Sequence, residues 1–334
     1  MNINLEKLME HPQNLILKLR NNVIDGKKIT KSDAIKLFNL DDKFLDQLSD
    51  AANFITRHFH GAKIDVEELA NIKKNFCSED CSFCAQSAFF NTKIDNYQLP
   101  SPEKIVKQAM NAKKDGASSY CLVAAWREPS SSDFEQVCKI ISEINKHVKI
   151  SVECSLGFLT FEQAKKLKSL NVIRYNHNLE TCRSMFSKIC STHTYQDRIN
   201  TLKIARKAGL ELCTGGIIGL GESKNQRKEL VFEIAELEPE EVTVNMLVPM
   251  PGTPLELQKP LSVAEITRVF ATLRFLLPNS IIKISGGRET NLEDDGQKIL
   301  LSGANGIISA GYLTMDGNPI QKDYEMIKEI NLEA

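Results

Sequence analysis

The sequence predicts an α/β fold, a (β/α)8 TIM-type barrel preceded by an N-terminal helical extension. From about residue 66 onward, short runs rich in β-branched residues alternate with amphipathic helical stretches. Strict alternation of this kind indicates a parallel sheet. Eight such units favour a closed barrel, with an open, doubly wound sheet as the alternative. The 334 residues are enough for one large barrel, and no Pro-rich linker interrupts them.

The first 65 residues are expected to form helices that pack on the barrel. The segment "TKSDAIKLFNL" offers Thr30 or Ser32 as an N-cap ahead of an apolar run. The segment "DDKFLDQLSDAANFITRHF" places its apolar residues at helical spacing. We therefore expect a helical extension over residues 1–65 and a barrel domain over residues 66–334, with the chemistry in the barrel.

Each expected strand is a short run in which β-branched or aromatic residues are common. The eight runs are "LANIKK" (69–74), "SYCLVAA" (119–125), "KISVECS" (149–155), "VIRYNHN" (172–178), "ELCTGGIIG" (211–219), "EVTVNMLV" (241–248), "IIKISGG" (281–287) and "GIISAG" (306–311). In a barrel of this type, catalytic residues lie on the loops that follow the carboxyl ends of the strands. Functional residues are therefore expected just after these runs.

Composition excludes several classes of partner. The formal net charge is -1, with 42% apolar and 25% charged residues, which argues against binding to nucleic acid or a membrane surface through bulk charge. The N-terminal segment is interrupted early by acidic residues, unlike a signal peptide, and we expect a cytoplasmic protein. In that reducing compartment, a cluster among the nine cysteines indicates metal ligation or catalysis and not disulfides.

Three cysteines, Cys77, Cys81 and Cys84, stand close together in "NFCSEDCSFCAQS", directly after the first expected strand. A structural zinc site normally has four protein ligands, often as two separated pairs, and a reactive thiol needs only one cysteine. An iron–sulfur cluster accepts three cysteines from one loop and leaves one iron open for a substrate or cofactor. The spacing therefore favours a cluster whose fourth ligand comes from outside the protein.

This C-x3-C-x2-C loop resembles the cluster loop of the radical S-adenosylmethionine (SAM) superfamily, and "CSEDCSFCAQS" is similar to that of the biotin synthases. The similarity runs from about residue 52 to the end through "SYCLVAAW", "VECSLGFLT", "YNHNLET", "STHTYQDRI", "ELCTGGIIGLGES", "VNMLVPMPGTPLE" and "SGGRE". The resemblance implies a 4Fe-4S cluster that binds SAM, and a radical enzyme that inserts sulfur into dethiobiotin. It also implies an auxiliary Fe-S cluster as sulfur donor (2Fe-2S, or a four-iron variant), a flavodoxin or ferredoxin as electron donor, and a homodimer.

The resemblance also assigns roles residue by residue. It makes Cys77, Cys81 and Cys84 the cluster ligands and the catalytic centre. It implies SAM contacts for Phe83, Asn178, Glu180, Arg198, Gly215, Ile217 and Gly219, and substrate contacts for Asn176, Asn178 and Asn245. Without the resemblance, the residues alone are explained as well by a loop-anchoring role for Phe83 and by a tight turn at the glycines as by contact with SAM. His177 alternates with the two asparagines beside it and is expected to be structural.

The auxiliary cluster is expected at cysteines inside strands. Cys121, Cys154 and Cys213 lie in three different expected strands, at positions similar to cysteines of the family. Where the best-known family pattern has an arginine ligand, this chain has Lys283, and a protonated ammonium has no lone pair for iron. Cys190 follows the fourth strand, and a thiolate is the better iron ligand. We therefore expect a four-cysteine site; the alternative makes Cys190 a spectator and Lys283 a counter-charge.

Two other functions compete with this one. The first is a radical SAM enzyme without sulfur insertion, of the maturase or mutase type, and such relatives generally lack the three strand cysteines. The second is a zinc-stabilised α/β binding protein, which would contain zinc and no iron. Elemental analysis separates the second function from the other two.

Overall fold

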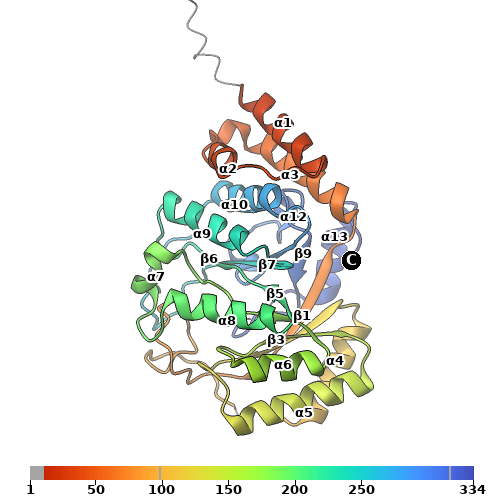
Figure 1. The fold of residues 1–334 in the computed structure, drawn as a ribbon, viewed down its shortest axis with the longest axis vertical. Helices are drawn as coiled ribbons and strands as arrows, with labels where there is room; N and C mark the ends of the chain where they lie inside the picture. Colours follow the sequence, from red (N-terminus) through yellow and green to blue (C-terminus); the bar gives the residue numbers. More distant parts are fainter. Residues whose placement is uncertain (1–10, 98, 316) are drawn as a thin grey trace, which may run out of the picture.

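The computed structural model describes residues 11–97, 99–315 and 317–334, so the first ten residues of the expected extension lie outside it (Figure 1). The described chain opens with α1 (Pro12–Ile24), α2 (Lys31–Phe38), the short 3-10 turn η2 (Asp42–Phe44) and α3 (Leu45–His60). Thr30 caps α2, because its side chain accepts a hydrogen bond from the backbone N–H of Asp33. These helices lie together at one end of the molecule.

Within the described residues, nine short strands form one parallel sheet. They are β1 (Asp65–Lys73), β2 (Ser119–Ala124), β3 (Ser151–Ser155), β4 (Val172–Asn176), β5 (Glu211–Cys213), β6 (Gly216–Ile218), β7 (Glu241–Met246), β8 (Ile281–Ile284) and β9 (Gly306–Ile308). The hydrogen-bonded order is β5-β4-β3-β2-β1-β9-β8-β7-β6, and a pairing of β5 with β7 closes the sheet. The predicted (β/α)8 barrel is confirmed, because β5 and β6 are two pieces of one predicted strand.

The break between β5 and β6 has a steric cause. A Cβ added at Gly215 would lie 1.8 Å from the backbone oxygen of Thr243 in β7, so only glycine fits at this contact. The backbone N–H of Thr214 donates to the Glu241 carbonyl at 3.1 Å, while the Gly215 carbonyl accepts from Leu179 N–H at 2.8 Å. The chain keeps both neighbours on either side of the break, since Cys213 pairs with Asn176 and Glu241, and Gly216 pairs with Val244 and Glu180.

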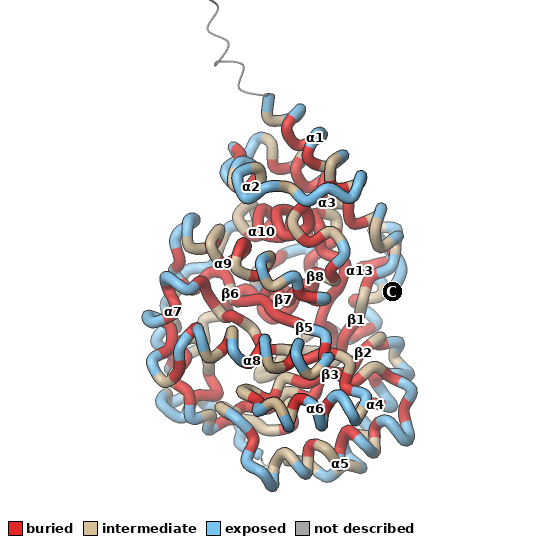
Figure 2. The backbone as a smooth tube through the Cα atoms, viewed as in Figure 1, coloured by how far each residue is buried: buried red, intermediate tan, exposed pale blue. Residues whose placement is uncertain are grey.

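Helices cover the outside of the barrel. They are α4 (Pro102–Lys114), α5 (Ser131–His147), α6 (Phe161–Ser169), α7 (Arg183–Ile189), α8 (Tyr195–Lys207), α9 (Lys224–Glu236), α10 (Val263–Leu276), α11 (Arg288–Asn291), α12 (Gln297–Leu300) and α13 (Ile320–Glu329). Buried residues form an inner layer beneath a largely exposed outer surface (Figure 2). Because the N-terminal helices pack on α10, its residues Ala271 and Phe275 join a second hydrophobic cluster with them.

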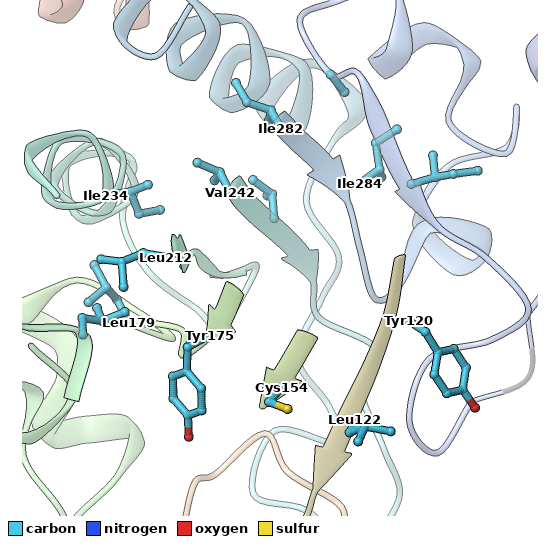
Figure 3. Packing of buried hydrophobic residues seen from close by; sticks show 14 of the residues in the cluster. Tyr120, Leu122, Cys154, Tyr175, Leu179, Leu212, Ile234, Val242, Ile282 and Ile284 are labelled. Atoms are coloured by element: carbon cyan, nitrogen blue, oxygen red, sulfur yellow. The ribbon is translucent and has the colours of Figure 1, made fainter. Parts of the chain in front are cut away.

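The strand register decides which side chains point into the barrel. Cys121 pairs with Glu153, and Leu122 pairs with Cys154. Register partners on neighbouring parallel strands share a face, and successive residues alternate between faces. Leu122 and Cys154 belong to the hydrophobic core between strands and helices, where Figure 3 shows them with Tyr175. Cys121 and Glu153 therefore point into the barrel.

No helix in the described part of the chain is long and apolar enough to cross a bilayer.

Candidate active site

A cavity opens at the carboxyl ends of the strands, where a barrel of this type holds its chemistry. The loop after β1 contributes Cys77, Cys81, Phe83 and Cys84 to its wall. The same wall includes Asn176, Asn178, Glu180, Arg198, Ile217 and Asn245. The structure thus brings most of the residues predicted to contact SAM and substrate around the cysteine loop.

The cysteine loop is shaped by its own backbone hydrogen bonds. The N–H of Cys77 donates to the carbonyl of Gln86 at 2.8 Å, and the N–H of Cys84 donates to the carbonyl of Cys81 at 2.9 Å. A further bond joins Ala88 N–H to the Cys77 carbonyl at 2.8 Å. The loop folds back on itself. Its three thiols can therefore face one cavity, although the first and last cysteines are seven positions apart in the chain.

The three thiols suit a metal cluster. Burial raises the pKa of Cys84 to about 12, and burial also raises the pKa of Cys77. A buried thiol of this kind stays neutral unless a cation stabilises its thiolate, since metal binding releases the proton. Three such thiols on one loop are the donor set of an iron–sulfur cluster with one open iron.

A polar network holds the outer side of the loop. The Asp80 carboxylate accepts the backbone N–H of Ser191 at 2.8 Å and that of Thr192 at 3.1 Å. The Glu79 carboxylate accepts from the Thr192 hydroxyl at 2.7 Å and contacts the ring of His193. Sequence reasoning missed Glu79, Asp80 and His193; their one signal is that "CSEDC" and "STHT" both lie in stretches similar to the family.

Cys190 belongs to this network. Its Sγ lies 3.2 Å from Asp80 Oδ1 and 3.2 Å from His193 Nδ1. Ligand atoms of Cys81, Cys190 and His193 all lie within 4.8 Å of one another. The structure thus places Cys190 beside Cys81 and His193, and the expectation that it completes the auxiliary site stays a prediction. Its position directly after α7 brings the thiol against the cysteine loop, a contact between distant segments that sequence order does not encode.

Arg198 joins the residues predicted to contact SAM. Its guanidinium lies 3.2 Å from the Glu180 carboxylate, donates to the Asn178 carbonyl at 2.9 Å and donates to His193 Nε2 at 3.0 Å. Glu180 has a φ of 67°, a left-handed conformation that is uncommon outside glycine. The Glu180 carboxylate can accept hydrogen bonds from the hydroxyls of a ribose, and the Arg198 guanidinium can donate to a carboxylate. Together they can bind the two polar parts of a nucleoside-linked amino acid.

The glycine-rich strand end contributes Ile217 to the cavity wall. Gly215 is required by the contact with Thr243 described above, independently of any ligand. Gly219 has a φ of 92°, and its N–H donates to the Glu222 carboxylate at 2.9 Å. Both glycines thus have a backbone role, and their predicted SAM contacts stay predictions.

Asparagine amides line the deeper part of the cavity. Asn176 Nδ2 lies 3.4 Å from Cys121 Sγ, and its Oδ1 is buried without a hydrogen-bond partner among the described residues. Asn245 Oδ1 accepts from Gly286 N–H at 2.9 Å. Leaving a buried polar atom unpaired costs about 1–3 kcal/mol. The free oxygen of Asn176 is therefore suited to accept a hydrogen bond from a bound ligand.

His177 also lines the cavity, between the two asparagines that precede and follow it. Burial lowers its pKa well below the ordinary value, and the neighbouring Arg198 acts in the same direction. Its ring lies 5.5 Å from that of Phe158, centroid to centroid. The ring is therefore neutral and packed, as expected for a structural residue, although its Nε2 has no partner in the described chain.

The barrel interior holds two of the three strand cysteines. Cys121 lines the cavity, and Cys213 shares a face with Asn176, its register partner. Cys154 points the other way, into the hydrophobic core (Figure 3). In this structure the inward position on β3 belongs to Glu153, and the role of Cys154 as an auxiliary-cluster ligand stays a prediction.

Lys283 lies at the centre of an acidic group below the cavity. Its Nζ contacts Glu67 at 2.6 Å, Glu241 at 2.7 Å and Asp65 at 2.8 Å. Burial works to lower the pKa of Lys283, but these carboxylates raise it well above its ordinary value. The ammonium stays protonated and cannot ligate iron. Its geometry fits the alternative in which Lys283 is a counter-charge.

Comparison with known proteins identifies the family. Residues 71–234 match the Radical SAM superfamily, and residues 243–333 match the Biotin and Thiamin Synthesis associated domain. The biotin synthase of Nitrosopumilus maritimus is 66% identical over 96% of this chain and 98% of its own length. The chain belongs to the biotin synthase family. The biotin synthases of Cenarchaeum symbiosum and Clostridium tetani are 60% and 42% identical, each over 96% of this chain and over 99% and 98% of their own lengths.

Family membership confirms the predicted activity and cofactors. The chain is a SAM-dependent radical enzyme that inserts sulfur into dethiobiotin, with a 4Fe-4S cluster and an auxiliary Fe-S cluster. The maturase and mutase alternatives find support only in fold. A methylornithine synthase structure has a TM-score of 0.84 at 20% identity, covering 94% of this chain and 96% of its own. A maturase of the [FeFe]-hydrogenase has a TM-score of 0.82 at 17% identity, covering 97% and 76%.

Proposed function

We propose that the cavity at the carboxyl ends of the strands is where this enzyme binds SAM and dethiobiotin. The observation that supports it most is that Cys77, Cys81 and Cys84 face the same cavity as Asn176 and Arg198. These three thiols would hold a 4Fe-4S cluster, which would supply the electron for the reductive cleavage of SAM. Binding, orientation and exclusion of water are the tasks of the surrounding side chains.

The SAM side of the cavity is assigned to the wall around Arg198. Phe83 and Ile217 offer apolar surface for a purine ring. Glu180 offers a carboxylate for ribose hydroxyls, and its contact with Arg198 at 3.2 Å fixes the position of both groups. Asn178 lies beside these two residues, because its backbone carbonyl accepts a hydrogen bond from the Arg198 guanidinium.

The dethiobiotin side is assigned to the asparagines. The unpaired Oδ1 of Asn176 can accept from an N–H of the ureido ring, which carries donors and an acceptor in one plane. Asn245 lines the same cavity; its Oδ1 accepts from the Gly286 N–H at 2.9 Å, and its Nδ2 lies 3.4 Å from the Gly216 carbonyl. Trp126 and Tyr312 close the wall with aromatic surface, which keeps water away from a reactive radical.

The test is anaerobic turnover. Protein reconstituted with iron and sulfide is incubated with SAM, dethiobiotin and a chemical reductant, and biotin and 5′-deoxyadenosine are measured by mass spectrometry. We expect both products from the native chain. Absence of 5′-deoxyadenosine from fully loaded protein would refute the assignment of the cavity as the SAM site.

Two partners are proposed on the basis of the chemistry and the family. SAM cleavage consumes an electron from outside, and a flavodoxin or a ferredoxin is the proposed donor. A homodimer is the proposed assembly. Replacing the chemical reductant by a reduced flavodoxin system and measuring 5′-deoxyadenosine tests the donor, and sedimentation equilibrium tests the dimer. The division of the chain at residue 65 likewise stays a prediction.

A further inference from the structure

Arg198 is fixed from two directions in the cavity wall. Its Nε donates to His193 Nε2 at 3.0 Å, while its Nη1 donates to the Asn178 carbonyl at 2.9 Å and lies 3.2 Å from the Glu180 carboxylate. Its third nitrogen, Nη2, donates no hydrogen bond within the described residues. Because a guanidinium is planar, two fixed edges leave Nη2 a single direction, and the side chain lines the cavity. Nη2 is therefore the donor that stays available to a ligand.

The contact between His193 and Arg198 follows from the way α8 begins. Thr194 is the N-cap: its hydroxyl accepts from the Asp197 N–H at 3.2 Å, and the Asp197 carboxylate accepts from the Thr194 N–H at 2.8 Å. Beside such a capping box, the residue before the N-cap often packs against the fourth residue of the helix. Those two residues are His193 and Arg198. The local sequence "HTYQDR" thus places the imidazole ring beside the guanidinium.

The two ring nitrogens of His193 have different partners. Nε2 accepts from Arg198, so it carries no proton, and the ring proton is on Nδ1. Nδ1 contacts the carboxylate of Glu79 and also lies 3.2 Å from Cys190 Sγ. Glu79 is itself held, because it accepts from the Thr192 hydroxyl at 2.7 Å. The His193 side chain is 1% exposed, so solvent cannot replace either partner, and the cysteine loop sets the orientation of the ring.

Two phenyl rings enclose the imidazole. The ring centroids of Phe158 and Phe186 lie 5.3 Å and 5.5 Å from that of His193, both in edge-to-face contact. This packing limits the tilt of the ring, while its two hydrogen-bond partners fix its rotation. Glu79 is a residue of the cysteine loop, between its first two cysteines. The path from Glu79 through His193 to Arg198 therefore ties the guanidinium to the loop that would hold the 4Fe-4S cluster.

We propose that His193 is a positioning residue for SAM binding. It holds the Arg198 guanidinium, through Nε, in a fixed place relative to the cysteine loop, and so leaves Nη2 free to donate to SAM. The proposal rests on the proposed function, because it takes Arg198 to contact SAM. Without the His193 acceptor, the Nε–H of Arg198 is buried and unpaired, and the side chain turns toward another acceptor at the expense of the ligand.

The test measures the dissociation constant of SAM by equilibrium dialysis, with anaerobically reconstituted protein and no reductant. His193→Phe keeps an aromatic ring between Phe158 and Phe186 and removes both nitrogens, and we expect it to weaken SAM binding roughly tenfold. His193→Gln places an amide oxygen within reach of Arg198 and should stay within about threefold of the native chain. His147→Phe is the matched control: His147 also pairs with a glutamate, at 3.3 Å, but is 48% exposed, and its replacement should leave the constant unchanged.

A double-mutant cycle separates positioning from a structural role. If His193 acts through Arg198, adding His193→Phe to Arg198→Lys should weaken SAM binding by less than about twofold beyond Arg198→Lys alone. Fully additive losses would overturn the proposal. His193→Phe should also keep the native iron content and the native affinity for dethiobiotin. Loss of iron together with loss of dethiobiotin binding would show that the residue only supports the fold.

The outcomes also distinguish this proposal from the proposed function. A native chain that binds no SAM refutes the proposed function, whereas a His193→Phe protein that binds SAM as tightly as the native chain refutes only the role of His193. If His193→Phe fails to fold, His193→Asn decides instead. Its amide is one methylene shorter than that of glutamine, so it reaches Glu79 but not Arg198, and SAM binding should again weaken roughly tenfold. A folded His193→Asn protein with native SAM affinity contradicts the proposal.

Discussion

Replacing Lys283 by methionine should destabilise the fold strongly and in a pH-dependent way. The ammonium is fully buried and contacts three carboxylates, those of Asp65, Glu67 and Glu241, at 2.6–2.8 Å. Removing one partner of a buried ion pair typically costs about 3–5 kcal/mol, because the remaining charges stay desolvated. For a chain of this length, that loss corresponds to a fall in Tm of roughly 4–8 °C.

The pH dependence follows from Glu67. Burial raises its pKa from 4.5 to about 7 in the folded state, so the folded chain binds this proton more tightly than the unfolded chain. Its contribution to stability is fully present below the unfolded pKa and is lost as pH rises through about 7. Without the Lys283 ammonium, protonation of Glu67 is favoured further and this window extends upward. The loss of stability in Lys283→Met should therefore be larger at pH 8 than at pH 6. The difference is about 1.4 kcal/mol for each pH unit over which the folded variant keeps Glu67 protonated and the unfolded chain does not.

Thermal unfolding of the anaerobic protein, followed by circular dichroism at pH 6 and pH 8, measures both effects. Lys28→Met is the matched control, because Lys28 pairs with Glu238 on the surface with its side chain 83% exposed. A surface pair contributes about 0–1 kcal/mol, so its Tm should hardly move. A Lys283→Met protein with the Tm of the native chain, or one more stable at pH 8 than at pH 6, would show that the acidic group is not organised around this ammonium.

Three further predictions concern the cavity. Cys81→Ala should abolish formation of 5′-deoxyadenosine while Cys138→Ala, on α5, should leave it unchanged; equal product from both would contradict the loop assignment. Arg198→Lys should raise the dissociation constant of SAM roughly tenfold, or about 1.4 kcal/mol, since a lysine cannot reach Glu180, Asn178 and His193 at once, and calorimetry with an unchanged constant would count against it. Asn176→Ala should weaken dethiobiotin binding by roughly five- to tenfold, about 1–1.4 kcal/mol, with SAM cleavage in the absence of dethiobiotin unaffected; unaltered dethiobiotin affinity would remove Asn176 from the substrate site.

Strand β3 shows where sequence reasoning reached its limit. In "VECS", Glu153 and Cys154 are neighbours, and both fall in a predicted strand. Because side chains alternate between faces with a period of two, an offset of one residue exchanges the inward and the outward side chain. The register of β3 against β4 shifts between Val152 and Glu153, and no signal in the sequence marks that irregularity.

The sequence by itself determined the fold, the cysteine loop and the family. The periodicity of apolar residues is a local property, so it predicts the strands and helices without information on how they pack. The spacing of Cys77, Cys81 and Cys84 within one loop is equally local. Only the tertiary structure decided the positions of Cys190 and Cys154, since contacts between segments far apart in the chain depend on how α7 meets the cysteine loop and on the register of β3. A sequence gives the type of each residue. Which side chains can bind the same ligand depends on the direction in which each one points, and that direction is fixed only when the barrel closes.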